Sequence, residues 1–186
     1  MNQKLERIIA LYGSPREGKS STLRELIKLM TGSLPSGVKH DYRVIIKDYY
    51  VQKEDKHVNV FIATCGDTKG VILKSILFFN GKLYSKPAAP IWLFDYGSKT
   101  WKKVMTKKDL MGIEANICVS ACRTKGGGVT AMQNYIKSHL PYTFFSAWIR
   151  LALLRKKLGT PKDMSKIANW NKIATELKII IDQIIA

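Results

Sequence analysis

The sequence predicts a single α/β domain over residues 1–186, with helices packed on a mostly parallel sheet. Three observations support this prediction. Apolar runs typical of strands alternate with stretches of helical periodicity along the chain. Apolar residues make up 46% of the 186 residues, enough for a buried core and too many for a disordered chain. A glycine-containing turn joins the first apolar run to the first helical stretch, the arrangement found where α/β domains bind ligands.

The first strand, expected over residues 5–12, runs directly into Gly13-Ser14-Pro15-Arg16-Glu17-Gly18-Lys19-Ser20. The spacing Gly-x-x-x-x-Gly-Lys-Ser, between a strand and a helix, is the phosphate-binding P-loop pattern. Gly13 and Gly18 allow the backbone to turn its N–H groups inward around an anion. The helix that follows directs its positive end to the same point. We therefore expect Lys19 to reach the β- and γ-phosphates of a nucleotide and the Ser20 hydroxyl to bind Mg²⁺.

At this motif the chain resembles the P-loop NTPase superfamily, and the specific likeness covers about the first third of the sequence. The resemblance implies a three-layer P-loop NTPase-like fold that binds a nucleoside triphosphate together with Mg²⁺. It does not specify a reaction. The nucleotide-binding residues that it implies are Gly13, Ser14, Arg16, Glu17, Gly18, Lys19, Ser20 and Ser21.

The helix after the loop has an apolar face that consists of Leu23, Leu26, Ile27 and Met30. Gly32 is suited to end this helix. Residues 42–50 and 58–64 are rich in β-branched and aromatic side chains and are predicted as strands. The charged break between these strands is shorter than the dozen or so residues that a parallel crossover needs. The second and third strands are therefore expected to form an antiparallel hairpin.

The third strand is followed by Asp67-Thr68-Lys69-Gly70. Many P-loop proteins place a Mg²⁺-directed acid just past a buried strand, and these four residues fit the short Asp-x-x-Gly signature of GTPases. The alternative, compatible with the first, is that Asp67 caps the helix expected over residues 71–78. We expect Asp67 to act on the metal beside Ser20.

A second hairpin is predicted near residues 91–105, as an excursion from the main sheet that spans about 84–110. It combines Trp92, Tyr96 and Trp101 with several lysines. Such rings could stack on bases while the lysines bind phosphates. They could equally pack against one another across the strands beneath solvated lysines.

The run 116–121 has the small and apolar composition of a buried parallel strand, in which Cys118 would be an inert core thiol, as would Cys122 just after it. The segment after this strand contains Arg123, Lys125 and three glycines. It is expected at the same sheet edge as the P-loop, where Arg123 or Lys125 could stabilise charge on a transferring phosphoryl group. Otherwise it is a flexible turn with solvated cations.

The remaining elements are a short helix over 129–136, a last strand over 142–148, helical character over 151–157, and a long helix that starts near Thr160-Pro161. No run is long enough to predict a membrane span. Three cysteines and a start without a targeting pattern favour a cytoplasmic protein with free thiols.

The charge balance is strongly basic, with 31 lysines and arginines against 14 acids and a net charge of +17. A polyanionic partner, DNA or RNA first, would explain this charge, as would a solvated basic surface without a dedicated partner. The leading interpretation is an Mg²⁺-dependent NTPase or phosphotransferase with Lys19, Asp67 and Arg123 as catalytic residues. ATP is favoured over GTP because the Asn-Lys-x-Asp guanine signature is absent after residues 117–121.

Two other functions are compatible with parts of the chain. One is a nucleic-acid-binding or assembly factor that uses the nucleotide as a switch, which the net charge favours. The other follows from Gly13-Ser14-Pro15-Arg16 and Ser20-Ser21-Thr22, which resemble the FMN phosphate loop of flavodoxin-like NAD(P)H-dependent reductases. That fold needs a crossover between its second and third strands, for which the chain leaves no room.

Overall fold

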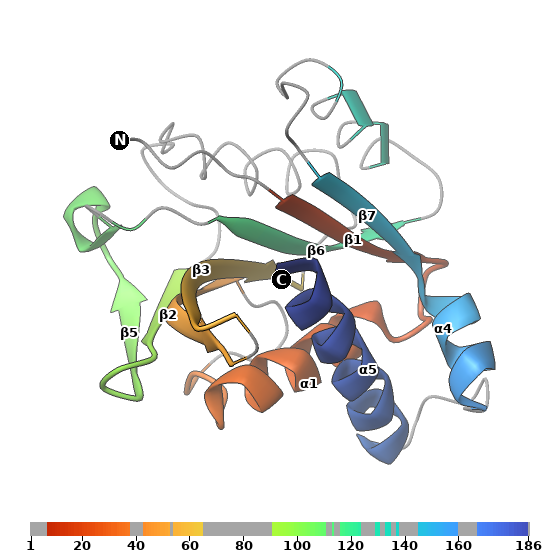
Figure 1. Cartoon of the computed structure of the whole chain (residues 1–186), viewed down its shortest axis with the longest axis horizontal. Helices are drawn as coiled ribbons and strands as arrows, with labels where there is room; N and C mark the ends of the chain where they lie inside the picture. Colours follow the sequence, from red (N-terminus) through yellow and green to blue (C-terminus); the bar gives the residue numbers. More distant parts are fainter. Residues whose placement is uncertain are drawn as a thin grey trace.

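The computed structural model describes residues 7–37, 43–52, 54–64, 91–110, 113, 116–123, 129–130, 133–134, 137, 145–159 and 167–185. These residues form a seven-stranded mixed sheet with three α-helices and one 3₁₀ helix (Figure 1). The strands lie in the order β5-β4-β2-β3-β6-β1-β7. The predicted α/β class and mostly parallel sheet are confirmed.

The strand that leads into the glycine-containing turn is β1 (Arg7–Gly13), which lies between β6 (Ile117–Arg123) and the edge strand β7 (Phe145–Arg150). Both neighbours run parallel to β1. The strand is a nearly continuous apolar run, as expected where both faces of a parallel sheet are covered. Because parallel strands end on the same side, the carboxyl ends of these three strands form one edge of the sheet.

The predicted antiparallel hairpin is confirmed in β2 (Arg43–Val51) and β3 (Lys56–Ala63). A register shift interrupts the pairing between Ile46 and Tyr49. From β3 onward toward β7 the sheet is parallel, because β3 pairs with β6 in that orientation. The carboxyl end of β3 therefore lies on the same edge as the ends of β6, β1 and β7.

The second predicted hairpin also forms, as β4 (Ile91–Asp95) and β5 (Thr100–Val104), followed by the 3₁₀ helix η1 (Lys107–Leu110). It was expected as an excursion from the main sheet, and this placement is wrong. β4 pairs in parallel with β2, so that the hairpin widens the sheet. The reason is that β2 presents buried apolar residues such as Val44 and Ile46, and its outer edge needs a hydrogen-bonding partner.

Three helices cover one face of the sheet: α1 (Lys19–Thr31), α4 (Leu151–Leu158) and α5 (Ile167–Ile185) (Figure 1). The apolar face predicted for the first helix is confirmed, since Leu23, Leu26, Ile27 and Met30 are all buried. Gly32 ends α1 in a left-handed conformation, and its N–H donates to the Lys28 carbonyl at 2.8 Å. Helical structure over residues 151–157 is also as predicted.

The opposite face has its own apolar cluster, which includes Ile8, Ala10, Phe61 and both described cysteines. Cys118 and Cys122 are fully buried and are not joined in a disulfide, which confirms their prediction as core thiols. None of the helices among the described residues has the length and apolar character required to span a bilayer. The predictions for the helix over 71–78 and for the helix start at 160–161 lie outside the described residues.

Candidate phosphate-binding site

The turn from β1 to α1 has the backbone conformation of an anion-binding loop. Gly18 adopts the left-handed conformation, with φ 87°, and immediately precedes α1. Arg16 is also left-handed, with φ 62°, which is uncommon for a residue with a side chain. Gly18 provides no side chain to cap α1, and the first turn of the helix contains no acid. The positive end of α1 therefore faces the loop without a fixed carboxylate from its own first turn.

Lys19 places its positive charge inside the loop. The residue is only 5% exposed, although lysine is almost never buried to that extent without partners. Its Nζ donates hydrogen bonds to the Gly13 carbonyl at 3.0 Å and to the Ser14 carbonyl at 2.7 Å. The ammonium group is thus held at the end of β1, where the sequence predicts the phosphates of a nucleotide.

The loop already holds one anionic oxygen, from its own Glu17. The Ser14 backbone N–H donates to Glu17 Oε2 at 2.9 Å. A Cβ atom at Gly13 would come within 2.2 Å of the same oxygen, so that the missing side chain of Gly13 is what makes room for it. The loop thus pairs one of its amides with an anionic oxygen and leaves space for that oxygen beside the strand.

Ser20, the predicted metal ligand, faces the end of β3. Its Oγ donates to the Thr64 carbonyl at 2.9 Å. Thr64 is buried and comes three residues before Asp67 in the sequence. Asp67 lies outside the described residues, so a metal site shared by Ser20 and Asp67 remains a prediction.

Arg123 lies beside the loop, as predicted. It is the last residue of β6 and pairs in register with Gly13, the last residue of β1. Its side chain is half-buried. Lys125 and the three glycines that follow lie outside the described residues.

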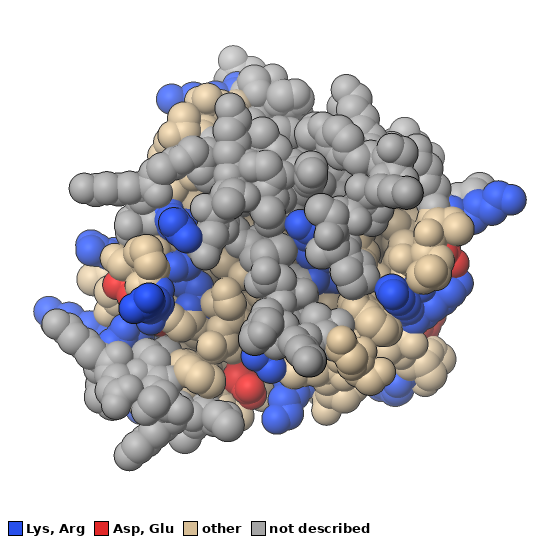
Figure 2. All heavy atoms as spheres, turned by 180° about the vertical axis from the view of Figure 1, so that it is seen from behind, with Lys and Arg blue, Asp and Glu red and all other residues tan. Residues whose placement is uncertain are grey.

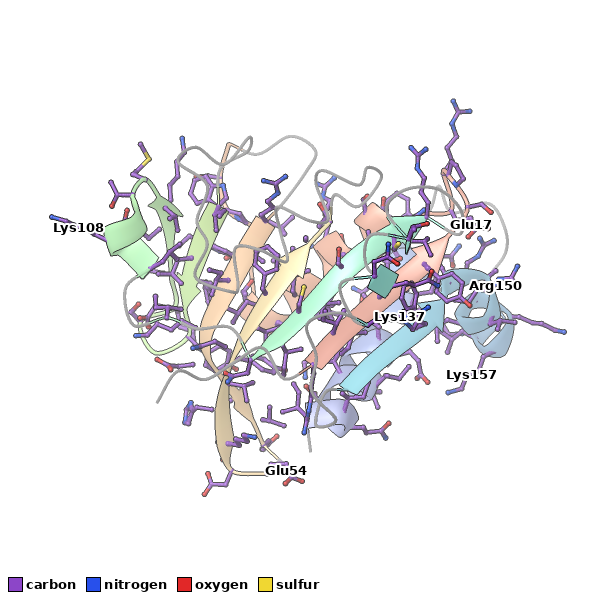
Figure 3. The ribbon with its side chains drawn as sticks, turned by 90° about the horizontal axis from the view of Figure 1, so that it is seen from above. Glu17, Glu54, Lys108, Lys137, Arg150 and Lys157 are labelled. Carbon is purple, nitrogen blue, oxygen red and sulfur yellow. The ribbon has the colours of Figure 1, made fainter. Side chains whose placement is uncertain are left out.

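The sequence prediction did not identify Arg150 at this edge. Arg150 is exposed and pairs in register with Tyr12, on the opposite side of β1 from Arg123. Leu151, which begins α4, would lie 3.6 Å from a Cβ at Gly13, so the end of β7 is adjacent to the loop. Figure 3 shows Arg150 and Lys137 at the same end of the sheet as Glu17. A charged residue directly after an apolar strand was the available signal, but the strand was expected to end at residue 148.

The aromatic residues of the second hairpin pack within the protein. Trp101 lies against Phe94 with ring centroids 4.9 Å apart, and its Nε1 donates to Ser33 Oγ at 3.0 Å. Lys99 Nζ lies 3.2 Å from the centroid of the Tyr96 ring. Of the two alternatives for this hairpin, the structure therefore favours cross-strand packing over a base-stacking surface.

No protein-family model matches the chain, and no curated protein or solved structure matches it either. Within the part of the chain that the structure describes, no three His, Cys, Asp or Glu side chains gather as metal ligands. The functional argument therefore depends on the chemistry of the loop and of the strand ends around it.

Proposed function

We propose that this protein binds a nucleoside triphosphate, ATP rather than GTP, together with Mg²⁺, and that it acts as a NTPase or phosphotransferase. In this proposal the α/β domain is a three-layer P-loop NTPase-like fold. The observation that carries the proposal is the pairing of the Ser14 amide with a carboxylate oxygen in a loop that also holds the buried Lys19. A loop that accommodates one anionic oxygen beside a fixed cation has the chemistry that a phosphate requires.

The proposed roles follow from where each group lies. Lys19 would turn from the loop carbonyls to the β- and γ-phosphates, a short movement for a flexible side chain. Ser20 would bind Mg²⁺ through its hydroxyl oxygen, and Asp67 would bind the metal through water. Arg123, which ends β6 beside Gly13, would stabilise negative charge that develops on the transferring phosphoryl group.

Nucleic-acid binding is a second candidate function, in which the nucleotide acts as a switch. The specific observation in its favour is the charge of +17, of which the phosphate loop accounts for only a small part. Figure 2 shows lysines and arginines in several places on the rear face of the molecule, with few acids among them. A flavodoxin-like FMN reductase is disfavoured, because β2 and β3 are antiparallel and joined by a short turn.

A thermal-shift panel with ATP, GTP and FMN, each with and without Mg²⁺, tests the proposal. A ligand that binds only the folded protein raises its melting temperature. We expect the largest rise with ATP and Mg²⁺, a smaller one with GTP and Mg²⁺, and none with FMN. A rise with FMN alone would instead support the reductase, and no rise with any nucleotide would remove the proposed function.

The two candidate functions differ in how the protein responds to nucleic acid. A small-molecule NTPase or phosphotransferase should hydrolyse or transfer phosphate at the same rate with and without added RNA or DNA. A nucleic-acid-binding switch should bind the polyanion with a steep dependence on salt concentration, because each phosphate contact releases counterions. Binding to a fluorescent oligonucleotide across a salt series, with turnover measured in parallel, separates them.

A further inference from the structure

We propose that the Glu17 carboxylate occupies the phosphate-binding position of the loop over residues 13–20, so that a bound nucleotide must displace it. This inference rests on the proposed function, since it concerns the same loop. The carboxylate accepts the Ser14 amide hydrogen bond at 2.9 Å and fills the space beside Gly13 that a Cβ would take. A phosphate oxygen that uses the Ser14 amide needs the same hydrogen and the same space. The carboxylate and the phosphate are therefore alternative ligands of one donor.

The backbone of the loop directs Glu17 to this position. Arg16 is held in the left-handed region at φ 62°, which folds the chain back so that residue 17 lies over residue 14. The Glu17 backbone N–H also approaches the Ser14 carbonyl, at 3.4 Å. Residues in such sparsely populated backbone conformations cluster at ligand-binding and switch sites. The loop without ligand is thus closed on itself.

Lys19 completes the closed loop. Its Nζ donates to the carbonyls of Gly13 and Ser14, the two residues beside which the Glu17 carboxylate lies. Glu17 accepts from the Ser14 amide and Lys19 donates to two carbonyls, so that the amide and the ammonium group that would contact a phosphate are both engaged within the loop. Nucleotide binding then exchanges these internal contacts for contacts with phosphate, and the exchange lowers the measured affinity.

Replacing the carboxylate by a neutral amide of the same shape tests this competition directly. Glu17→Gln keeps the length of the side chain but removes the negative charge, and neutral acceptors form hydrogen bonds roughly half as strong. Glu54→Gln is the matched control, because it removes the same charge from the turn after β2 at the opposite end of the molecule (Figure 3). Calorimetric titration with ATP and Mg²⁺ measures the affinity of each variant.

We expect Glu17→Gln to bind ATP about three to ten times more tightly than the unchanged protein, the range that a weakened charge-assisted hydrogen bond allows. Glu54→Gln should bind like the unchanged protein. Equal or weaker binding by Glu17→Gln would overturn the competition, because it would make Glu17 a support of the loop or a bystander. The proposed function would still stand if Lys19→Ala lost binding in the same titrations.

A measurement without nucleotide gives a second readout. In the ligand-free protein, the Ser14 amide proton should resonate downfield because it is bonded to a carboxylate, and Glu17→Ala should move it upfield. An unchanged Ser14 resonance would overturn the contact itself. Absence of ATP binding in both the unchanged protein and Glu17→Gln would instead remove the nucleotide from the proposal along with its competitor.

Discussion

The hydroxyl of Ser20 donates a hydrogen bond to the carbonyl oxygen of Thr64 at 2.9 Å, and this contact joins the start of α1 to the end of β3. A hydroxyl has one hydrogen to donate and two lone pairs. Because the hydrogen is directed at Thr64, the lone pairs of Oγ remain for a cation. The contact also fixes the end of β3 beside the loop, which is where the chain continues toward Asp67.

Ser20→Ala and Asp67→Asn should both weaken the effect of Mg²⁺ on nucleotide affinity. Each removes one oxygen-based interaction with the metal, whereas contacts between the loop and the phosphates remain. Titrations of ATP in the presence and absence of Mg²⁺ measure the effect, with Ser36→Ala in the exposed loop after α1 as a control. A metal titration that Asp67→Asn leaves unchanged would assign Asp67 to helix capping alone.

Lys19→Ala should abolish measurable nucleotide binding while the protein remains folded. The variant loses the ammonium group that the Gly13 and Ser14 carbonyls hold inside the loop, and the apolar face of α1 is untouched. Lys28→Ala, an exposed lysine on the same helix, is the matched control. Circular dichroism checks the fold, and calorimetry checks the binding. Normal affinity in Lys19→Ala would place the nucleotide elsewhere.

Arg123→Ala should lower turnover far more than it lowers nucleotide affinity, by about a hundredfold or more if the side chain acts on the transferring phosphoryl group. Arg150→Ala provides the comparison. Arg123 ends β6 and pairs with Gly13, whereas Arg150 ends β7 on the other side of β1 and pairs with Tyr12. Steady-state kinetics on both variants separates the two arginines. A larger loss of turnover in Arg150→Ala would assign the catalytic cation to β7.

Leu26→Ala should destabilise the protein by about 2–5 kcal/mol, because truncation of a buried leucine leaves a cavity. Leu26 is 0% exposed in α1, at the interface between the helix and the rest of the core. Leu29→Ala on the same helix is 38% exposed and should cost about 0.5 kcal/mol or less. Urea denaturation of both variants gives the comparison. Equal losses would mean that α1 does not bury the face that contains Leu26.

The free energy of unfolding should fall as the pH rises from 9 to about 12. Burial raises the pKa of the Cys118 thiol from 9.0 to about 12, and burial is also the main cause that raises the pKa of the Tyr49 hydroxyl from 10.0 to about 12. In this range the unfolded chain releases these protons while the folded chain retains them, so that unfolding becomes more favourable.

Cys118→Ala isolates one of these two contributions. The variant should lose stability at every pH through its cavity, but its stability should fall less steeply with pH above 9. Urea denaturation at a series of alkaline pH values measures both slopes. Parallel slopes for the variant and the unchanged protein would show that the thiol does not contribute to alkaline unfolding.

Local signals in the sequence predicted much of the fold. The short charged break after residue 50 required the β2–β3 hairpin, and Gly32 ended α1 where expected. Pairing between strands that are distant in the sequence was harder to predict. Nothing local distinguishes a hairpin that stands apart from one that joins the edge of β2, because the difference depends on which edge is left unpaired. The placement of β4 beside β2 is therefore a property of the assembled sheet.

In the candidate site, too, the features with a local sequence signal were predicted and the others were not. The spacing of Gly13, Gly18 and Lys19 predicted the position of the loop between the first strand and the first helix. The contact between Glu17 and Ser14 was not predictable, because it requires Arg16 in a left-handed conformation that sequence rarely signals outside glycine. Arg150 was not predicted as a site residue, because no glycine or proline marks the point at which β7 ends and α4 begins.

The strand that leads into the loop has both of its neighbours, β6 and β7, in the second half of the chain. During synthesis, β1 emerges early and must wait for these partners before its backbone groups are paired. Contacts between residues so far apart in sequence slow folding, because the intervening chain loses entropy before the contacts form. The turn between β1 and α1 is therefore assembled late, and truncation after β6 should remove β7 and α4, which lie next to it.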